Sequence, residues 1–460
     1  MRLIRFAGLQ CSGRLSGILF QAPEPFMKAR TLLLALTLAC VPMAQASVAP
    51  LNLNEQAMVR YIEQHHDSQV ALLEQLVNIN SGTGNRRGVE QVGEILRPQF
   101  ERLGFQTRWV DLPAPMTHAG SLVATLGSGK RRILLIAHLD TVFAPESPFQ
   151  TFQRSADQRT ATGPGVLDNK GGLVTLLYAL KALDEAGRLG EASITVVLVG
   201  DEEQAAQPSS ISRQALRDAA QQSEIALGLE FASTAQGLVT GRRGISAWQL
   251  SSHGQARHSS LLFGPQAGFG AIYETARVLE AMRIAFSQHP GLTVNPGILA
   301  GGRTANLDTR QNTASAEGLK NIIAGETHVH GDLRFLSQAQ QREAEQTLRD
   351  IAAASLPGTS STLQFNDIMP AMSETHGNRQ LLAQFSEISE VLGGGPLQAV
   401  PTVERGGADI SYVANLVDAG LDGLGPWGTG AHSDQETLEL AALPVVTQRL
   451  AIFISRLQER

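Results

Sequence analysis

Apolar residues recur at helical spacing from Leu51 to about Gly104, which predicts a helical N-terminal part. Short apolar runs follow, and they alternate with one longer stretch of helical pattern. The runs predict strands at residues 122–126, 133–137, 194–199 and 225–229, and a helix at 171–186. Alternation of this kind predicts an α/β domain with a mostly parallel sheet flanked by helices.

The pattern changes after Gly241. It predicts a strand at 245–252, a helix at 267–288, a strand at 326–335 and a helix at 337–354, which together indicate a compact α+β module. The polar, turn-rich segment 301–320 is expected to be irregular. From about Met369 the chain returns to a helix, strands near 420–425 and a final helix at 443–457. We therefore predict one discontinuous domain, 47–242 with 369–460, and an inserted domain, 243–368.

The first 46 residues have the pattern of a targeting segment. Basic residues after Met27 precede a short apolar stretch, and small residues mark a cleavage site near Ala46. We therefore predict an N-terminal extension and signal peptide, and a periplasmic or secreted mature protein. The apolar stretch is too short to span a bilayer comfortably, so no stable membrane association is expected. The formal net charge of −6 and an aromatic content of 5% give no nucleic-acid footprint.

Metal-type ligands stand where the predicted strands and loops end. These residues are His138, Asp168, Glu202, Glu203, Glu230 and His432. In a largely parallel sheet, ligands gather at the carboxyl ends of the strands. Two imidazoles and three carboxylates could hold two divalent ions and leave one carboxylate free as a base. Such mixed oxygen and nitrogen ligation suits Zn²⁺, with Co²⁺ or Mn²⁺ as substitutes.

Each of these residues also has a plainer interpretation. Asp140 could fix the tautomer of His138, or the two could be an ordinary strand-end pair. Asp168 could cap a helix. Glu202 and Glu203 could form a solvated acidic turn, although adjacent carboxylates after an apolar strand repel one another unless cations are present.

Two further candidates fall in the predicted insertion. His258 could donate to an oxyanion during attack on a carbonyl, or it could be a surface histidine. Arg334 could bind a substrate carboxylate through its bidentate fork, or it could form a surface salt bridge.

The motifs in their order resemble the co-catalytic zinc aminoacylase/carboxypeptidase family. They are the stretches 138–142, 163–172, 201–203 and 432–434. Within the family the chain is most similar to glutamate carboxypeptidases of the carboxypeptidase G type. The resemblance implies a zinc-peptidase (phosphorylase/hydrolase-like) catalytic domain with an inserted dimerisation or lid domain. It also implies two Zn²⁺ per chain, a homodimer formed through the insertion, and amide hydrolysis that releases a C-terminal amino acid such as glutamate.

The same resemblance assigns roles to the candidates. Asp168 would bridge the two ions, His138 and Glu230 would complete one, and Glu203 and His432 the other. Glu202 would be the general base and Asp140 would orient His138. His258 would assist the oxyanion, often from the partner subunit, and Arg334 would contact the substrate carboxylate.

The chain departs from the family pattern mainly around the substrate pocket. Asn169 stands beside the bridging aspartate, the segment 204–208 replaces a common Gly-Ser, and Ser259-Ser260 follow His258. Ala324 and Ala408 replace the usual Pro and Thr, and no arginine occurs around 368–370. We expect the substrate to be a small peptide or an N-acyl amino acid. Three functions stay open: an exopeptidase, an N-acyl amino acid amidohydrolase, or a catalytically silent binding scaffold.

Overall fold

The computed structural model describes residues 50–127 and 129–459, all within one compact unit, Val48–Arg460. The predicted extension, signal peptide and cleavage site at 1–46 lie outside the described residues. In the described part of the chain, no helix is both long and apolar enough to cross a membrane.

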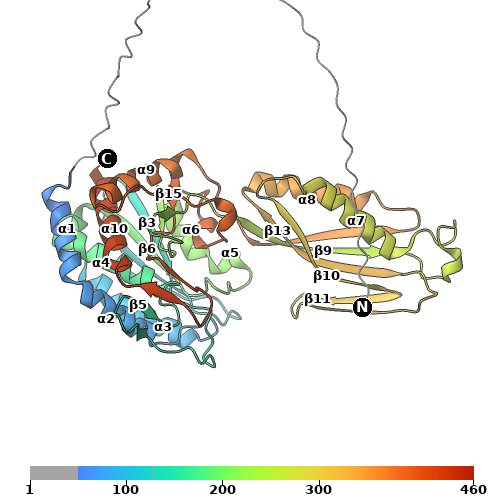
Figure 1. The fold of residues 1–460 in the computed structure, drawn as a ribbon, viewed down its shortest axis with the longest axis horizontal. Coiled ribbons are helices and arrows are strands. Elements are labelled where there is room, and N and C mark those ends of the chain that lie inside the picture. Colours follow the sequence, from blue (N-terminus) through green and yellow to red (C-terminus); the bar gives the residue numbers. More distant parts are fainter. Residues whose placement is uncertain (1–49, 128, 460) are drawn as a thin grey trace, which may run out of the picture. The chain divides into compact units, whose positions relative to one another are not determined.

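A six-stranded mixed sheet forms the centre of the larger part of the fold (Figure 1). Its strands, in sheet order, are β1 (Gln106–Val110), β2 (Ser121–Leu126), β6 (Ser193–Val199), β3 (Arg132–His138), β7 (Ile225–Gly228) and β16 (Ala419–Leu421). Strands β6, β3, β7 and β16 run parallel, and only β2 opposes its neighbours. The predicted α/β class with a mostly parallel sheet is confirmed. Strand β3 is buried almost throughout, as expected for an interior parallel strand with a continuous apolar run.

Helices cover both faces of this sheet. One face packs in a core with α1 (Leu53–Gln64), α2 (His66–Val77), α3 (Arg86–Arg102), α4 (Lys170–Glu185), α9 (His376–Val391) and α10 (Ala442–Glu459). The other face packs on α6 (Gln214–Gln221), which follows the short α5 (Ser209–Ser212), and on the 3-10 turn η4 (Asp409–Tyr412). Nearly every position of α4 is buried, because it also contacts α1, α2 and α10.

Two small sheets tie the C-terminal segment to earlier loops. An antiparallel sheet joins β17 (Gly428–Thr429), β18 (Thr437–Glu439), β5 (Thr160–Thr162) and β4 (Gln153–Arg154). A second pairs β8 (Gly237–Leu238) with β15 (Gln398–Ala399). The pairing of β18 with β5 brings residues near 430 beside the loop that follows β5.

A four-stranded antiparallel sheet forms the second layered part of the chain. Its strands are β10 (Thr293–Gly302), β13 (Glu326–Phe335), β9 (Gly244–His253) and β14 (Ser360–Met369), in sheet order. One face packs on α7 (Gly270–Phe286) and α8 (Gln338–Ala353) in a separate core. Strands β9 and β13 were predicted, whereas β10 and β14 were missed. Both are edge strands in which no residue is fully buried, so their apolar pattern is weak. The domain division 47–242, 243–368 and 369–460 stays a prediction.

The expectation that 301–320 is irregular is wrong. The segment forms a β-hairpin of β11 (Thr304–Asp308) and β12 (Thr313–Glu317). Backbone hydrogen bonds pair the strands while most of their side chains face solvent, so the sequence shows no apolar period there. The Asp308 carboxylate accepts the N–H groups of Arg310 and Gln311 in the turn.

Candidate metal centre

The candidate ligands meet at one edge of the large sheet. His138 is the last residue of β3, Glu203 follows β6, and Glu230 follows β7. Because β6, β3 and β7 are parallel neighbours, their carboxyl ends lie at the same edge. Asp168 precedes α4, and His432 lies between β17 and β18. The small antiparallel sheet thus brings His432 to residues more than 200 positions earlier.

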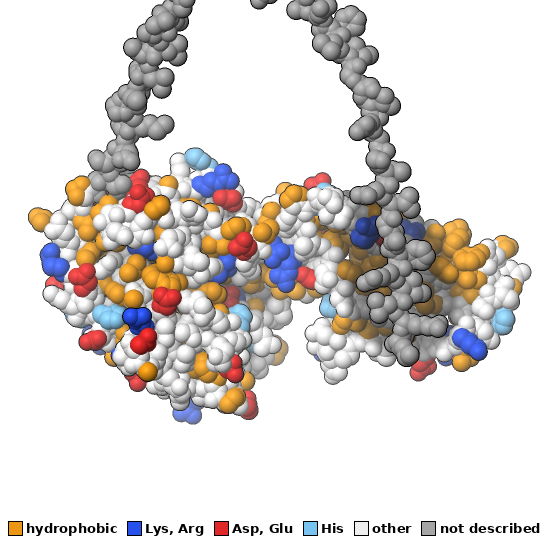
Figure 2. Space-filling model, in the orientation of Figure 1, with side chains coloured by type: hydrophobic (Ala, Val, Ile, Leu, Met, Phe, Trp, Pro, Cys, Tyr) orange, Lys and Arg blue, Asp and Glu red, His pale blue; other side chains and the backbone are white. Residues whose placement is uncertain are grey.

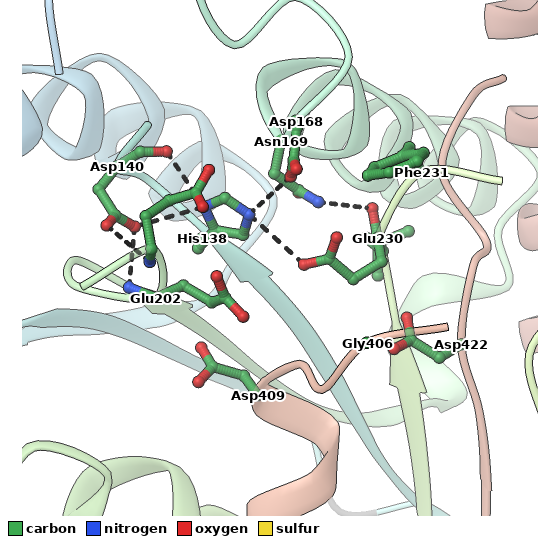
Figure 3. A network of polar contacts seen from close by, with 12 residues as sticks. His138, Asp140, Asp168, Asn169, Glu202, Glu230, Phe231, Gly406, Asp409 and Asp422 are labelled. Atoms are coloured by element: carbon green, nitrogen blue, oxygen red, sulfur yellow. Dashed lines mark hydrogen bonds and ion pairs between the residues drawn. The ribbon is translucent and has the colours of Figure 1, made fainter. Parts of the chain in front are cut away.

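Two groups of three ligands share Asp168, one with His138 and Glu230 and the other with Glu203 and His432. Asp168 Oδ1 lies 3.0 Å from His138 Nε2, and its Oδ2 lies 3.0 Å from His432 Nε2. His138 Nε2 is 3.4 Å from Glu230 Oε1. His432 Nε2 is 3.3 Å from Glu203 Oε2. Each oxygen of Asp168 therefore serves a different group, and Figure 3 shows the group around His138.

These residues fit a pair of divalent cations. Three carboxylates converge in a partly buried site, and Glu203 Oε1 is buried with no hydrogen-bond partner among the described residues. Hydrogen bonds to Asp168 and Glu203 raise the pKa of His432 to about 11. Burial raises the pKa of Glu203, and that of Glu202 more strongly. The clustered carboxylates thus favour binding of protons or of other positive charge, and bound metal ions would supply that charge.

Asp140 holds both a ligand and the turn after β6. His138 Nδ1 lies 3.1 Å from the Asp140 carbonyl oxygen and 3.3 Å from its Oδ1. The carboxylate accepts the backbone N–H of Glu202 at 3.0 Å and that of Glu203 at 3.1 Å. It also accepts the Thr83 hydroxyl at 2.7 Å. One buried carboxylate thus fixes the imidazole and the two glutamates together.

A buried ion cluster that the sequence did not predict lies next to Glu202. Arg213 is fully buried, and its Nη1 donates to Asp201 Oδ1 at 2.6 Å. Its Nε donates to Asp409 Oδ1 at 2.5 Å. Asp201 also accepts the backbone N–H of Ala206 at 2.8 Å. In Figure 3 the Asp409 carboxyl group lies beside that of Glu202, and the Asp409 charge contributes to the raised pKa of Glu202 after burial.

Glu436 is a second residue that the sequence did not reveal. Its fully buried carboxylate accepts the backbone N–H groups of Gly165, Leu167 and Asp168 at 3.2, 2.8 and 2.9 Å. Burial raises its pKa to about 7. The side chain fixes the loop that carries the shared aspartate. Its only signal in the sequence is its position four residues after His432.

The two candidates in the second sheet's segment make local contacts instead. His258 is exposed, and its Nδ1 lies 2.8 Å from Ser260 Oγ. Arg334 Nε donates to Asp332 Oδ2 at 2.9 Å. Within the described residues, neither side chain forms a hydrogen bond or ion pair with the ligand set.

Comparison with known proteins agrees with this geometry. The model of peptidase family M20/M25/M40 matches residues 134–456, well over half of the chain. Carboxypeptidase G2 of Pseudomonas sp. (strain RS-16) is 28% identical over 388 residues, which cover 82% of this chain and 86% of that protein.

Solved structures share the fold. Aminopeptidase PepT from Bacillus cereus superposes with a TM-score of 0.66 at 18% identity, over 85% of this chain and 98% of the other. The YXEP protein of Bacillus subtilis, described as a dinuclear metal binding peptidase, has a TM-score of 0.58 at 14% identity, over 86% of this chain and 99% of that one. The resemblance found from the motifs is confirmed. The chain is a hydrolase that belongs to peptidase family M20/M25/M40.

Proposed function

We propose that the chain is a metal-dependent exopeptidase that hydrolyses an amide bond and releases a C-terminal amino acid, with glutamate as the first candidate. One observation carries the proposal: the two ligand groups share Asp168, and the turn that holds Glu202 is fixed beside them by Asp140. The proposed resident ions are two Zn²⁺ per chain, with Co²⁺ or Mn²⁺ as substitutes, because the ligand atoms are imidazole nitrogens and carboxylate oxygens.

The residues divide the chemical work between them. When bound, the two ions would polarise the substrate carbonyl and lower the pKa of a water molecule. Glu202 is the one carboxylate of the Glu202–Glu203 pair that belongs to neither ligand group. It accepts the proton of the attacking water and passes it to the leaving nitrogen. A base suits this task when its pKa is raised toward neutrality, and burial raises the pKa of Glu202.

Substrate contacts are proposed for the second sheet's segment. Arg334 binds the substrate's terminal carboxylate, and its partial exposure leaves the guanidinium within reach of a ligand. His258 supports the oxyanion of the reacting carbonyl, in the same chain or across a dimer.

A homodimer through the inserted segment is part of the proposal. Strand β10 is an edge strand, so its outer backbone groups are available for pairing. Ile272, Tyr273 and Leu299 are each about half exposed, and Figure 2 shows hydrophobic side chains gathered beside α7. Sedimentation of the zinc-loaded chain would support the proposal by a dimer mass and contradict it by a monomer mass.

The targeting pattern before Ala46 supports a periplasmic or secreted location.

A second candidate function is that of an N-acyl amino acid amidohydrolase. The absence of an arginine at 368–370, where glutamate-specific relatives carry one, favours it. Turnover of dipeptides, folates and N-acyl amino acids, with and without a chelator, separates the two functions. Release from the peptide or folate substrates supports the exopeptidase, and release from N-acyl amino acids alone supports the amidohydrolase. No turnover at full metal occupancy would indicate the silent scaffold instead.

A further inference from the structure

A cavity of about 510 Å³ opens beside the ligand group that contains His432. Its size lies within the range of small-molecule sites. The walls come from three loops beside the six-stranded sheet, and the lining residues are Gly82, Thr83, Gly84, Thr141, Val142, Ala144, Pro145, Glu203 and Gln204. Glu203 belongs both to this wall and to the ligand group. A group held in the cavity therefore lies next to the reacting centre.

The walls are held in place by contacts with the rest of the fold. Thr83 N donates to the Thr141 carbonyl oxygen at 3.1 Å, so the first two loops are joined by their backbones. Thr83 Oγ1 donates to Asp140, the residue that also fixes Glu203. The cavity is thus built from the same framework as the metal centre and needs little rearrangement on binding.

The lining has a clear charge character. Among the described residues that line the cavity, Glu203 is the only charged one, and none is a lysine, an arginine or a histidine. The Thr83 hydroxyl is engaged with Asp140, and Val142 presents an exposed aliphatic side chain. Ala144, Pro145 and two glycines complete a small, mostly apolar surface, with the Gln204 amide at one wall. An anionic group placed there would lose water without gaining a cationic side chain among the described lining residues.

We propose that this cavity binds the acyl-side group of the substrate, and that this group is uncharged and mostly apolar. The inference rests on the proposed function. A released C-terminal residue carries a carboxylate, for which an arginine fork is the matching side chain, and no arginine or lysine is among the described lining residues. The amine side of the substrate therefore lies elsewhere, and the acyl side occupies the cavity. The segment 204–208, which departs from the family pattern, contributes Gln204 to this wall.

Binding of matched analogues tests the inference. Calorimetry on the zinc-loaded full chain would compare phosphinic dipeptide analogues that differ only in a glutaminyl or glutamyl group on the acyl side. The two side chains have nearly the same shape and differ in charge. We expect the glutaminyl analogue to bind at least about tenfold more tightly, since charge without a partner is disfavoured. Equal affinities, or tighter binding of the glutamyl analogue, would overturn the inference.

Variants at the exposed Val142 locate the preference in this cavity. Val142→Arg adds a cation to the wall, and Val142→Met is a neutral control of similar length. We expect the glutamyl-to-glutaminyl affinity ratio to rise about tenfold in the arginine variant relative to the methionine variant. The same ratio in both variants would contradict the placement.

A steric variant provides an independent check. A Cβ atom added at Gly84 meets no atom within 4 Å, so the Gly84→Trp variant has open space for the first atom of its side chain at the cavity wall. It should weaken binding of a leucyl analogue more than binding of a glycyl analogue, and equal effects would count against the inference. Turnover of the corresponding dipeptides is followed in parallel. If binding shows the charge preference but no dipeptide is cleaved, the proposed function fails while the cavity assignment stands.

Discussion

Replacing Arg213 by leucine should destabilise the protein strongly. Its guanidinium joins Asp201 Oδ1 at 2.6 Å and Asp409 Oδ1 at 2.5 Å, and both carboxylate side chains are almost fully buried. Arg213→Leu would leave two buried carboxylates without their cation. Removing one partner of a buried ion pair costs about 3–5 kcal/mol, against a total stability of about 5–15 kcal/mol for a typical domain. Because two carboxylates lose their partner, we expect the free energy of unfolding to fall by about 5 kcal/mol.

Urea unfolding followed by tryptophan fluorescence measures this loss. A chelator in all samples keeps metal binding from changing the comparison. Arg159→Leu is the matched control, because Arg159 is 85% exposed and lies 3.8 Å from Asp157. That variant should change the free energy of unfolding by no more than about 0.5 kcal/mol. Equal unfolding midpoints for the two variants would refute the role given to the buried cluster.

A compensating variant distinguishes lost charge balance from lost packing. If the cost of Arg213→Leu comes from uncompensated charge, adding Asp201→Asn and Asp409→Asn should recover part of the stability. A triple variant no more stable than Arg213→Leu would show that the arginine acts through its packing alone.

Three further perturbations test neighbouring features. Glu436→Gln places an amide where backbone N–H groups of the Asp168 loop donate to a carboxylate. We expect zinc affinity, measured by competition with a chelator, to fall about 10–100-fold. The exposed control Glu439→Gln should leave zinc affinity unchanged. Burial raises the pKa of Asp409 from 3.8 to about 6, so the folded chain binds more protons between these values and stability falls as pH rises through them. Asp409→Asn should flatten this fall between urea midpoints at pH 4 and pH 7 in chelator, and an unchanged fall would contradict it. Chelation should lower Tm and zinc should restore it, because each occupied site adds about 2.7 kcal/mol to the free energy of unfolding at a free-ion concentration 100 times Kd. A Tm insensitive to zinc would argue against the site.

The sequence predicts the position of the ligands well because they follow the ends of strongly apolar strands. Runs such as 133–137 and 194–199 are recognisable from hydrophobicity alone. Once those strands are parallel neighbours, His138 and Glu203 must reach the same edge of the sheet. His432 reaches the other ligands through the pairing of strand β18 with β5, and no local sequence pattern predicts that pairing.

The supporting residues could not be predicted for a physical reason. Arg213 and Glu436 act through contacts with residues 196 and up to 271 positions away, and an isolated arginine or glutamate looks like a surface residue in the sequence. Strands β10 and β14 were missed because edge strands need no apolar alternation. Periodicity therefore reveals what is buried on one face, while polar networks and edges emerge only from tertiary contacts.

We propose that Glu202 acts as a base beside a two-metal site rather than as a ligand. The most direct test is steady-state turnover of Glu202→Gln on the best wild-type substrate, with metal content determined on the same sample. We expect about two ions per chain in both proteins and a fall in kcat of about 10²–10⁴-fold in the variant. Unchanged turnover at equal metal content would contradict it.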